Sequence, residues 1–270
     1  MTKRVLLTND DGIDAPGLAS LAMVLAASYE VYVLAPDQER SGVGHGFTLF
    51  SPLRCDEVSG RFPADLVRKA WKSNGTPVDC VKLALLLMMK DTPPDLVVSG
   101  INRGANLAID TLYSGTVSAA MEAMIMGFPA IACSLATHFE GTATHTHFAG
   151  VAEIVSEYIA SHEEQLLQMK DYCLNINVPG VPRNELKGAR YTRLGKCWYE
   201  DRFQVHKDPG GRPYYWIEGS LNIDEQYEDS DVVAVRQKYV SITPLSSDLT
   251  SMGQFQKLHG QEPFPGGMNG

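Results

Sequence analysis

Short apolar segments alternating with helical ones constrain the fold of this chain more than any other feature of its sequence. Four segments have the length and apolar character of buried strands: Lys3 to Thr8, Glu30 to Pro36, Asp95 to Ser99 and Ala130 to Leu135. Three segments between them show helical spacing or helix-capping signals: Gly17 to Ser28, Thr76 to Met89 and Thr116 to Met126. This alternation predicts right-handed β-α-β units and a Rossmann-like, doubly wound, mostly parallel α/β sheet. Such sheets bind ligands at the carboxyl ends of their strands.

The second half of the chain has a different texture. We expect a helix between Phe148 and Met169, a strand from Cys173 to Val178, and a strand-like segment from Val232 to Thr243. Aromatic residues from Tyr191 to Glu218 flank a turn at residues 208–211, which predicts a projecting β-hairpin. We therefore divide the chain into an α/β core (1–185), a hairpin region with a returning strand (186–245), and a C-terminal segment for oligomer contacts (246–270). Its last ten residues contain two Pro and three Gly and are expected to be flexible.

Composition excludes several classes of protein. A net charge of −9 argues against binding to a nucleic-acid duplex, so any phosphate ester needs a local positive centre. No apolar run approaches the roughly 20 residues of a membrane span, and a strand begins almost at once, without a signal peptide. Five widely spaced cysteines fit reduced thiols better than a disulfide framework. We therefore expect a cytoplasmic protein.

Four polar motifs follow predicted strands and so should meet at one edge of the sheet. They are T-N-D-D-G at 8–12, D-Q-E-R-S-G-V-G-H-G at 37–46, S-G-I-N-R-G-A-N at 99–106 and S-G-T at 114–116. Adjacent carboxylates at Asp10 and Asp11 repel one another unless a cation lies beside them, and oxygen ligands suit Mg²⁺ or Mn²⁺. The alternative is an ordinary turn at Asp11-Gly12, with Asp14 capping the next helix.

The other three motifs each allow a functional and an ordinary interpretation. The glycines around Ser41 can expose N–H groups to an anion, and the Ser41 hydroxyl can bind a metal, or the segment is only a mobile loop. Asn102 can offer its carbonyl oxygen to a cation or hydrogen-bond the backbone. Ser114 and Thr116 open a helix whose N-terminus can hold phosphate, although either can also be a plain N-cap.

These motifs, in this order, closely resemble the SurE family of metal-dependent nucleotide phosphatases. The matching stretches are LLTNDDGIDAPGL, APDQERSGVGHG, SNGTPVDCVKLAL, PDLVVSGINRGANL, YSGTVSAAMEA and the later YVSITPL. They cover most of residues 4–135 and recur near residue 240. Between about 140 and 230 the resemblance is thin.

The resemblance implies a site, a reaction and an assembly. One divalent cation per subunit, Mg²⁺ or Mn²⁺, would be held by Asp10, Asp11, Ser41 and Asn102. The phosphate would be held by Ser114, Gly115 and Thr116, and we expect further substrate contacts from Asn9, Gly42, His45 and Asn106. The substrates would be nucleoside 5′- and 3′-monophosphates, with short polyphosphate in some members. Family members are dimers or tetramers in which the C-terminal segment exchanges between subunits and a hairpin joins the dimers.

The expected mechanism is in-line attack on phosphorus by a water that the cation activates. Asp10 or Asp11 can accept the proton of that water. One alternative makes Asp10 a covalent nucleophile, as in haloacid dehalogenase-like phosphatases, although their motif separates its two Asp residues by one position. Another is a nucleotide-binding sensor without turnover. A dinucleotide-dependent oxidoreductase is disfavoured because the G-x-G-x-x-G fingerprint is missing.

Histidines and aromatic residues outside these motifs leave roles open. His45 can protonate the leaving group, or it only positions its loop or contacts phosphate. His138, His145 and His147 contain an H-x-H pattern that can bind zinc, although an exposed polar linker is the simpler interpretation. The hairpin aromatics can stack on a base or pack against another subunit: Trp198, Tyr199, Tyr214, Tyr215 and Trp216.

Overall fold

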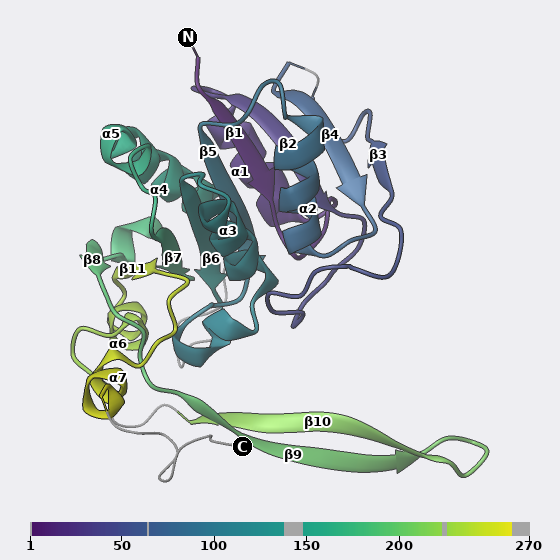
Figure 1. Ribbon diagram of the computed structural model, residues 1–270, viewed down its shortest axis with the longest axis vertical. Coiled ribbons are helices and arrows are strands. Elements are labelled where there is room, and N and C mark those ends of the chain that lie inside the picture. Colours follow the sequence, from purple (N-terminus) through teal and green to yellow (C-terminus); the bar gives the residue numbers. More distant parts are fainter. Residues whose placement is uncertain (1, 64, 138–147, 223–225, 261–270) are drawn as a thin grey trace, which may run out of the picture.

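The computed structural model describes residues 2–63, 65–137, 148–222 and 226–260 (Figure 1). Its described strands form one nine-stranded sheet, in the order β3-β4-β2-β1-β5-β6-β7-β11-β8, and a separate two-stranded hairpin of β9 and β10. The strands from β4 to β7 run parallel to one another, whereas β3 pairs antiparallel with β4 and β11 pairs antiparallel with β7 and parallel with β8. The prediction of a mostly parallel, doubly wound α/β fold with a projecting hairpin is confirmed.

The elements follow one another along the chain in β-α alternation. The strands are β1 (Arg4–Thr8), β2 (Glu30–Pro36), β3 (Cys55–Glu57), β4 (Val67–Ser73), β5 (Leu96–Arg103), β6 (Ala130–Ala136), β7 (Cys173–Pro179), β8 (Ala189–Tyr191), β9 (Trp198–Lys207), β10 (Pro213–Asn222) and β11 (Val240–Leu245). The α-helices are α1 (Pro16–Leu25), α2 (Pro77–Leu83), α3 (Gly115–Ile125), α4 (Phe148–Ser161), α5 (Glu163–Leu166), α6 (Asp231–Arg236) and α7 (Met252–Leu258). Three further turns are the π-helical η1 (Ala84–Met88) and the 3₁₀-helical η2 (Ala108–Leu112) and η3 (Arg183–Glu185).

Two apolar cores lie on opposite faces of the sheet. Alternate residues of β1 show the division, because Val5 and Leu7 pack with α1 and α4, whereas Leu6 packs with α2 and α3. All three side chains are at most 1% exposed. A strand buried on both faces must be apolar throughout, and this is why the central strands could be recognised from sequence.

The strand order reverses between β1 and β5. From β1 the chain moves outward to β2 and β4 on one side, while β5, β6 and β7 extend the sheet on the other. The two strands pair in parallel register, with Thr8 opposite Ser99. Their carboxyl ends therefore lead Asp10 and Asn102 out at the same place, which is the position where open α/β sheets bind ligands.

Three predictions about individual elements need correction. The segment from Val232 to Thr243 is not one strand, because residues 231–236 form α6 before β11 begins. The side chain of Ser230 caps that helix by accepting from Val233 N at 3.2 Å. The helix expected from Phe148 to Met169 is divided into α4 and α5. The strands β3 and β4 lie between Pro36 and Thr76, where the sequence analysis predicts no strand.

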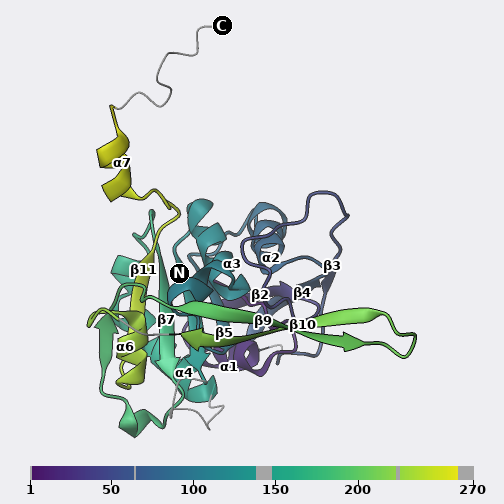
Figure 2. The same ribbon diagram turned by 90° about the horizontal axis from the view of Figure 1, so that it is seen from below.

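The hairpin and the C-terminal part extend from the body of the protein (Figures 1 and 2). The turn expected at residues 208–211 joins β9 and β10, with Asp208 N donating to Arg212 O at 2.9 Å. Tyr214, Tyr215 and Trp216 are 44–63% exposed on β10, and the side chains of Trp198 and Tyr199 lie outside the described part. His138, His145, His147 and residues 261–270 also lie outside the described residues. None of the helices in the described ranges is long and apolar enough to cross a membrane.

Candidate active site at the carboxyl ends of β1 and β5

Asp10 lies at the centre of the site, directly against the start of α3. Its side chain comes from the loop after β1 and is only 4% exposed. Thr116 Oγ1 donates to Asp10 Oδ1 at 2.5 Å. Burial raises the pKa of Asp10, and interactions with the Thr116 side chain and with the backbone of Thr116 and Gly115 oppose that rise. The carboxylate thus occupies part of the helix N-terminus that we expected to hold phosphate.

Asp11 faces the end of β5. Arg103 N donates to Asp11 Oδ2 at 3.2 Å, so Asp11 contacts the residue next to Asn102. Burial and then the charge of Asp10 raise the pKa of Asp11 to about 6, against a smaller lowering by the Arg103 hydrogen bond. Two carboxylates that disfavour each other's ionisation in a half-buried place are a strong site for a cation.

The side chain of the neighbouring residue, Asn9, is hydrogen-bonded within the turn itself. Its side chain is fully buried, with Nδ2 donating to Gly12 O at 2.9 Å and Oδ1 accepting from Gly12 N at 3.2 Å. These two bonds close the loop that presents Asp10 and Asp11. The structure therefore places both ends of the Asn9 amide on the backbone of Gly12.

The loop after β2 passes beside Asp10. Arg40 N donates to the backbone carbonyl of Asp10 at 2.7 Å. Ser41 is therefore the residue next to a direct contact with the Asp10 backbone. The Ser41 hydroxyl itself donates to Glu39 Oε1 at 2.7 Å. Farther along, Gly44 N donates to Tyr113 O at 3.0 Å, so the loop spans from β1 to the turn before α3. Gly42 lies between these two tethers, with a positive φ of 74°.

Asn102 and Asn106 have different surroundings although they share one motif. Asn102 Nδ2 donates to Gly104 O at 3.0 Å, so its carbonyl oxygen is the end not used in this bond. Asn106 is buried, and its backbone N donates to Asn177 Oδ1 at 2.8 Å. The Asn106 carbonyl accepts from Asn175 Nδ2 at 2.8 Å and from Asn177 Nδ2 at 3.0 Å. Asn106 thus anchors the loop after β5 to β7, the strand beyond β6 in the sheet.

The start of α3 combines a helix cap with close packing against Asp10. Ser114 is the N-cap, and its Oγ accepts from Val117 N at 3.1 Å. A Cβ atom added at Gly115 would lie 2.8 Å from the Asp10 Cβ and 3.0 Å from Asp10 Oδ2. Only glycine allows the first turn of the helix to approach the carboxylate this closely.

Sequence reasoning missed several residues that support the site. Asn175 and Asn177 lie two positions apart in a fully buried strand, and two buried amides on one strand face are a signal of a polar network. Glu122 is the only charged residue of α3, and it binds His45 and Lys82 from two other elements. A lone acid in a helix of small and apolar residues could have been singled out in the same way.

The residues present fit a hard divalent cation. Asp10, Asp11, Ser41 and Asn102 supply only oxygen donors, as Mg²⁺ and Mn²⁺ prefer. In the described ranges no three acidic, histidine or cysteine side chains gather as a cation site, so neutral oxygens would have to complete the shell. Thr8 Oγ1, at the end of β1, and Ser99 Oγ, opposite it within β5, are buried hydroxyls without a partner among the described atoms. They are unsatisfied polar atoms on the two strands that carry the site.

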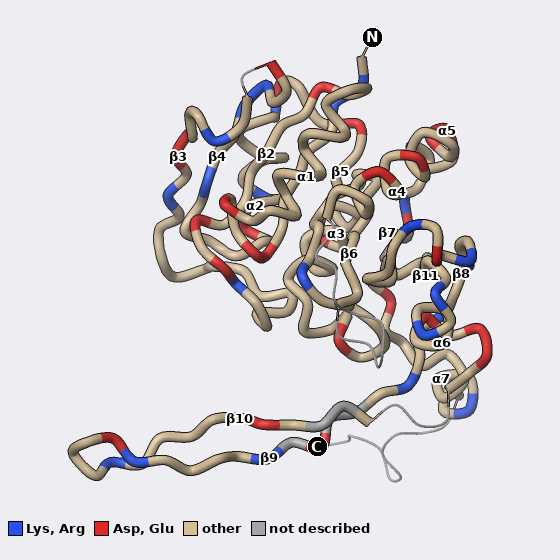
Figure 3. The backbone as a smooth tube through the Cα atoms, turned by 180° about the vertical axis from the view of Figure 1, so that it is seen from behind, with Lys and Arg blue, Asp and Glu red and all other residues tan. Residues whose placement is uncertain are grey.

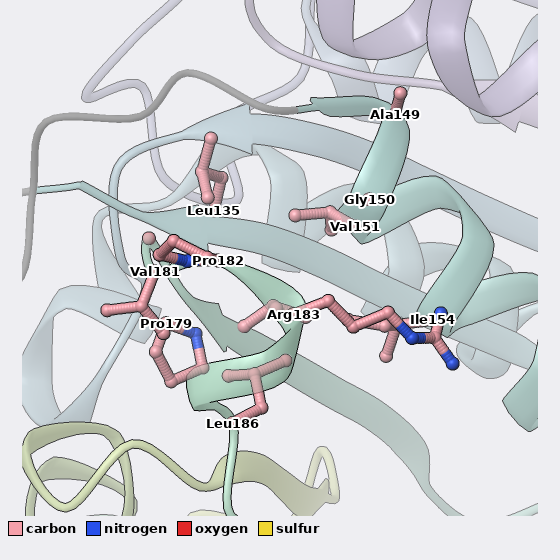
Figure 4. A pocket seen from close by; sticks show the side chains of 12 residues that line it. Leu135, Ala149, Gly150, Val151, Ile154, Pro179, Val181, Pro182, Arg183 and Leu186 are labelled. Carbon is pink, nitrogen blue, oxygen red and sulfur yellow. The ribbon is translucent and has the colours of Figure 1, made fainter.

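A separate hollow of about 210 Å³ opens near the carboxyl ends of β6 and β7 (Figure 4). Leu135, Val151 and Val178 are among its largely apolar lining. Arg183 is the only charged residue of this lining, and its guanidinium binds Glu157 Oε2 at 2.6 Å. The residues expected to bind the cation and the phosphate, around Asp10 and Ser114, are not part of this lining.

Comparisons with known proteins agree with this geometry. The family model described as "Survival protein SurE" matches residues 5–201. A protein named 5′-nucleotidase SurE from Thermosynechococcus vestitus is 47% identical over 92% of each chain. One of the same name from Alkaliphilus metalliredigens is 45% identical over 94% of this chain and 97% of its own. The crystal structure of the SurE protein from Aquifex aeolicus matches with a TM-score of 0.76 and 37% identity, covering 94% of this chain and 98% of that one.

Proposed function

Since the chain belongs to the SurE family, we propose that it is a phosphatase that hydrolyses nucleoside monophosphates to nucleoside and phosphate. The observation that carries this proposal is the contact between the Asp10 carboxylate and the first turn of α3. A helix N-terminus attracts phosphate, and a carboxylate pair attracts a divalent cation. Their contact brings both kinds of recognition into one site. The name 5′-nucleotidase, carried by relatives 44–47% identical to this chain, agrees with it.

The proposed cofactor is one divalent cation per subunit, Mg²⁺ or Mn²⁺, held by Asp10, Asp11, Ser41 and Asn102. When bound, such a cation lowers the pKa of water, polarises a phosphoryl oxygen and offsets the charge that develops on it. The support within this chain is that Ser41 follows Arg40, whose N donates to the Asp10 backbone carbonyl, and that Asn102 precedes Arg103, whose N donates to the Asp11 carboxylate. The pKa of Asp11, raised to about 6 by burial and by Asp10, also favours a positive charge beside the pair.

The protein's own groups divide the work between binding and proton transfer. Ser114, Gly115 and Thr116 hold the phosphate through the hydroxyls and N–H groups at the start of α3. Asp11 is the better candidate for accepting the proton of the attacking water, because Asp10 is more deeply buried and its Oδ1 is engaged by Thr116.

Substrate range, assembly and location complete the proposal. Because the described groups recognise phosphate rather than a nucleoside, we extend it to 3′-monophosphates and short polyphosphate. A homodimer or homotetramer is supported by exposed apolar side chains on the hairpin, such as Trp216 and Ile217, both 63% exposed. Exchange of the C-terminal segment is supported by exposed Leu249 and Leu258 near and in α7. Five free cysteines favour a reducing compartment, the cytoplasm.

The proposal is tested by phosphate release from a panel of nucleoside 5′- and 3′-monophosphates, with EDTA, with Mg²⁺ and with Mn²⁺. We expect release that EDTA abolishes and an added cation restores. Binding of nucleotide without release, under every cation, would instead identify a sensor. Release that is indifferent to EDTA would contradict the cation site.

The Asp10→Asn variant tests the residue at the centre of the site. We expect turnover to fall about 10³-fold or more, because the variant loses one of two charged cation ligands. Its fold should persist, since the substitution keeps the shape of a side chain whose charge is disfavoured by burial. Asp91→Asn, at an exposed position, is the matched control and should keep full activity. A covalent aspartyl-phosphate trapped on the wild-type protein would favour Asp10 as a nucleophile instead.

A further inference from the structure

Glu122 is a buried acid in a helix that otherwise carries no charge. The sequence of α3 is G-T-V-S-A-A-M-E-A-M-I, and the Glu122 side chain is only 7% exposed. A buried carboxylate is costly unless charged or hydrogen-bonding partners compensate for its lost hydration. The helix that begins at the phosphate-binding residues therefore holds a polar group that requires specific partners.

Those partners come from two other elements. His45 Nε2 lies 2.8 Å from Glu122 Oε2, and Lys82 Nζ lies 2.5 Å from Glu122 Oε1. Burial raises the pKa of Glu122, but the hydrogen bonds from Lys82 and His45 outweigh it, so the pKa is lowered overall. Glu122 is therefore ionised at neutral pH, and both its oxygens accept hydrogen bonds. We call Glu122, His45 and Lys82 the Glu122 cluster.

His45 belongs to the glycine loop, which we define as residues 41–46. Gly42 and Gly44 have positive φ values of 74° and 54°, and the loop contains no regular secondary structure. Its conformation is fixed by separate tethers: Arg40 N to Asp10 O, Gly44 N to Tyr113 O, and the His45 bond to Glu122. Just beyond it, Thr48 binds the buried Asp79 of α2 through its N at 3.0 Å and its Oγ1 at 2.7 Å. Backbone with so few local bonds is mobile unless such tethers hold it.

The contacts of His45 favour the positioning interpretation. Its Nε2 is engaged by the Glu122 carboxylate at 2.8 Å. A general acid must come within about 3 Å of the group it protonates, and an Nε2–H that donates to Glu122 does not at the same time protonate a leaving group. His45 is well placed to hold the loop against the helix.

We propose that Glu122 and Lys82 are positioning residues, which hold His45 and thereby fix the glycine loop so that Ser41 faces the Asp10–Asp11 pair. This inference rests on the proposed function for its catalytic consequence. Lys82 keeps Glu122 ionised, and the carboxylate then accepts a hydrogen bond from Nε2 of His45. The loop ends at the same helix whose first turn contacts Asp10, so one rigid element sets the position of both sides of the site.

The first test measures the loop without using activity. Amide hydrogen exchange of residues 42–47 is compared in the metal-free wild type and in His45→Ala, His45→Gln and Glu122→Gln. We expect at least tenfold faster exchange in His45→Ala and Glu122→Gln, and near wild-type exchange in His45→Gln, whose amide can still donate to Glu122. Glu164→Gln, an exposed acid on α5, should leave the loop unchanged. Unaltered exchange in His45→Ala would overturn the proposal.

The second test is a split between kinetic parameters. In His45→Ala we expect the Mn²⁺ concentration for half-maximal activity to rise about tenfold, with a smaller effect on kcat at saturating Mn²⁺. His45→Gln should restore the Mn²⁺ requirement. A loss of kcat above 100-fold at saturation, without faster exchange, would overturn positioning and make His45 a catalytic residue.

The two tests also separate this inference from the proposed function. A wild type that releases no phosphate would contradict the proposed function, while hydrogen exchange would still decide whether the Glu122 cluster holds the loop. Glu122→Gln leaves Lys82 without its charged partner in a part-buried place and can fail to fold. His45, whose side chain is 35% exposed, provides the variant that stays testable in that case. In the double variant His45→Ala with Glu122→Gln, exchange should match either single variant within twofold; additive acceleration would overturn a shared role.

Discussion

Replacing Gly115 by alanine should lower the activity of the protein while leaving it folded. The added Cβ would lie 2.8 Å from the Asp10 Cβ, 3.0 Å from Asp10 Oδ2 and 3.0 Å from Pro77 Cγ. Carbon atoms in contact are ordinarily about 3.5–4.0 Å apart. Either Asp10 or the first turn of α3 must therefore move by roughly 0.7 Å, the difference between 2.8 Å and the lower limit of that range. The closest atom is the Asp10 Cβ, which is bonded directly to the backbone, so a change of the Asp10 side-chain rotamer cannot remove the contact.

A shift of that size has a large effect on the rate of catalysis and a small effect on the stability of the fold. A misplacement of about 1 Å in a catalytic group costs on the order of 10²-fold in rate, or about 2.7 kcal/mol of transition-state stabilisation. Overpacking costs about 1–3 kcal/mol of stability, and a helical Gly→Ala substitution returns up to about 1 kcal/mol. We expect kcat/KM in Gly115→Ala to fall by about 10–100-fold and the free energy of unfolding to fall by about 0–2 kcal/mol.

The matched control is Gly150→Ala, at a helical position in α4 where an added Cβ meets nothing within 4 Å. It should keep full activity and gain about 0.4–1 kcal/mol of stability. The assay is phosphate release from a nucleoside monophosphate with saturating Mn²⁺, beside denaturant unfolding of both variants. Activity of Gly115→Ala within threefold of wild type would refute the reasoning, because the site would then tolerate the added Cβ beside Asp10 without loss of catalysis.

Two further predictions follow from other contacts. The raised pKa of Asp11, about 6 from burial and the charge of Asp10, favours its protonated form in the folded state. Without a cation, ionisation of Asp11 therefore destabilises the fold as pH rises from 4 to 7, so Asp11→Asn should become increasingly more stable than wild type across that range. With Mn²⁺ the wild type should be the more stable protein. A difference in stability that does not change with pH would contradict this. Asn177→Ala leaves Asn106 N without a partner and removes one of the two donors to the Asn106 carbonyl. The free energy of unfolding should therefore fall by about 2 kcal/mol. A fall of less than about 0.5 kcal/mol would contradict a structural role for the buried amides.

The central strands could be predicted because burial on both faces leaves little freedom in their sequence. The strand expected at Glu30 to Pro36 has those bounds in the structure. The strand β4, V-R-K-A-W-K-S, was missed because several of its side chains remain exposed, and its charged residues resemble a loop. The helix α6 was taken for a strand because D-V-V-A-V-R is rich in β-branched residues, whose preference the Ser230 cap and burial in the core override.

The residues of the candidate site could be found from sequence, but their connections could not. Each motif follows a strand or opens a helix, and a parallel sheet brings such positions to one edge. Which side chain contacts which depends on packing between elements far apart in the chain. The bond between His45 and Glu122 joins residues 77 positions apart, and no local pattern around either residue specifies the other. The sequence therefore indicates the candidate residues, while the structure provides the residues that support them.

The electrostatics of the chain itself argue for a cation, independently of its relatives. The protein carries a net charge of −9, and its acidic and basic residues are interspersed over the body (Figure 3). Asp10 lies against the first turn of α3, so a phosphate bound there would lie close to the carboxylate pair, and ionised carboxylates repel it. The pair therefore repels the substrate that the helix N-terminus attracts. Acidification could remove this repulsion, but it would also protonate the carboxylate proposed to accept the proton from water. A bound cation removes the repulsion while leaving that base ionised, which is why catalysis near neutral pH should require one.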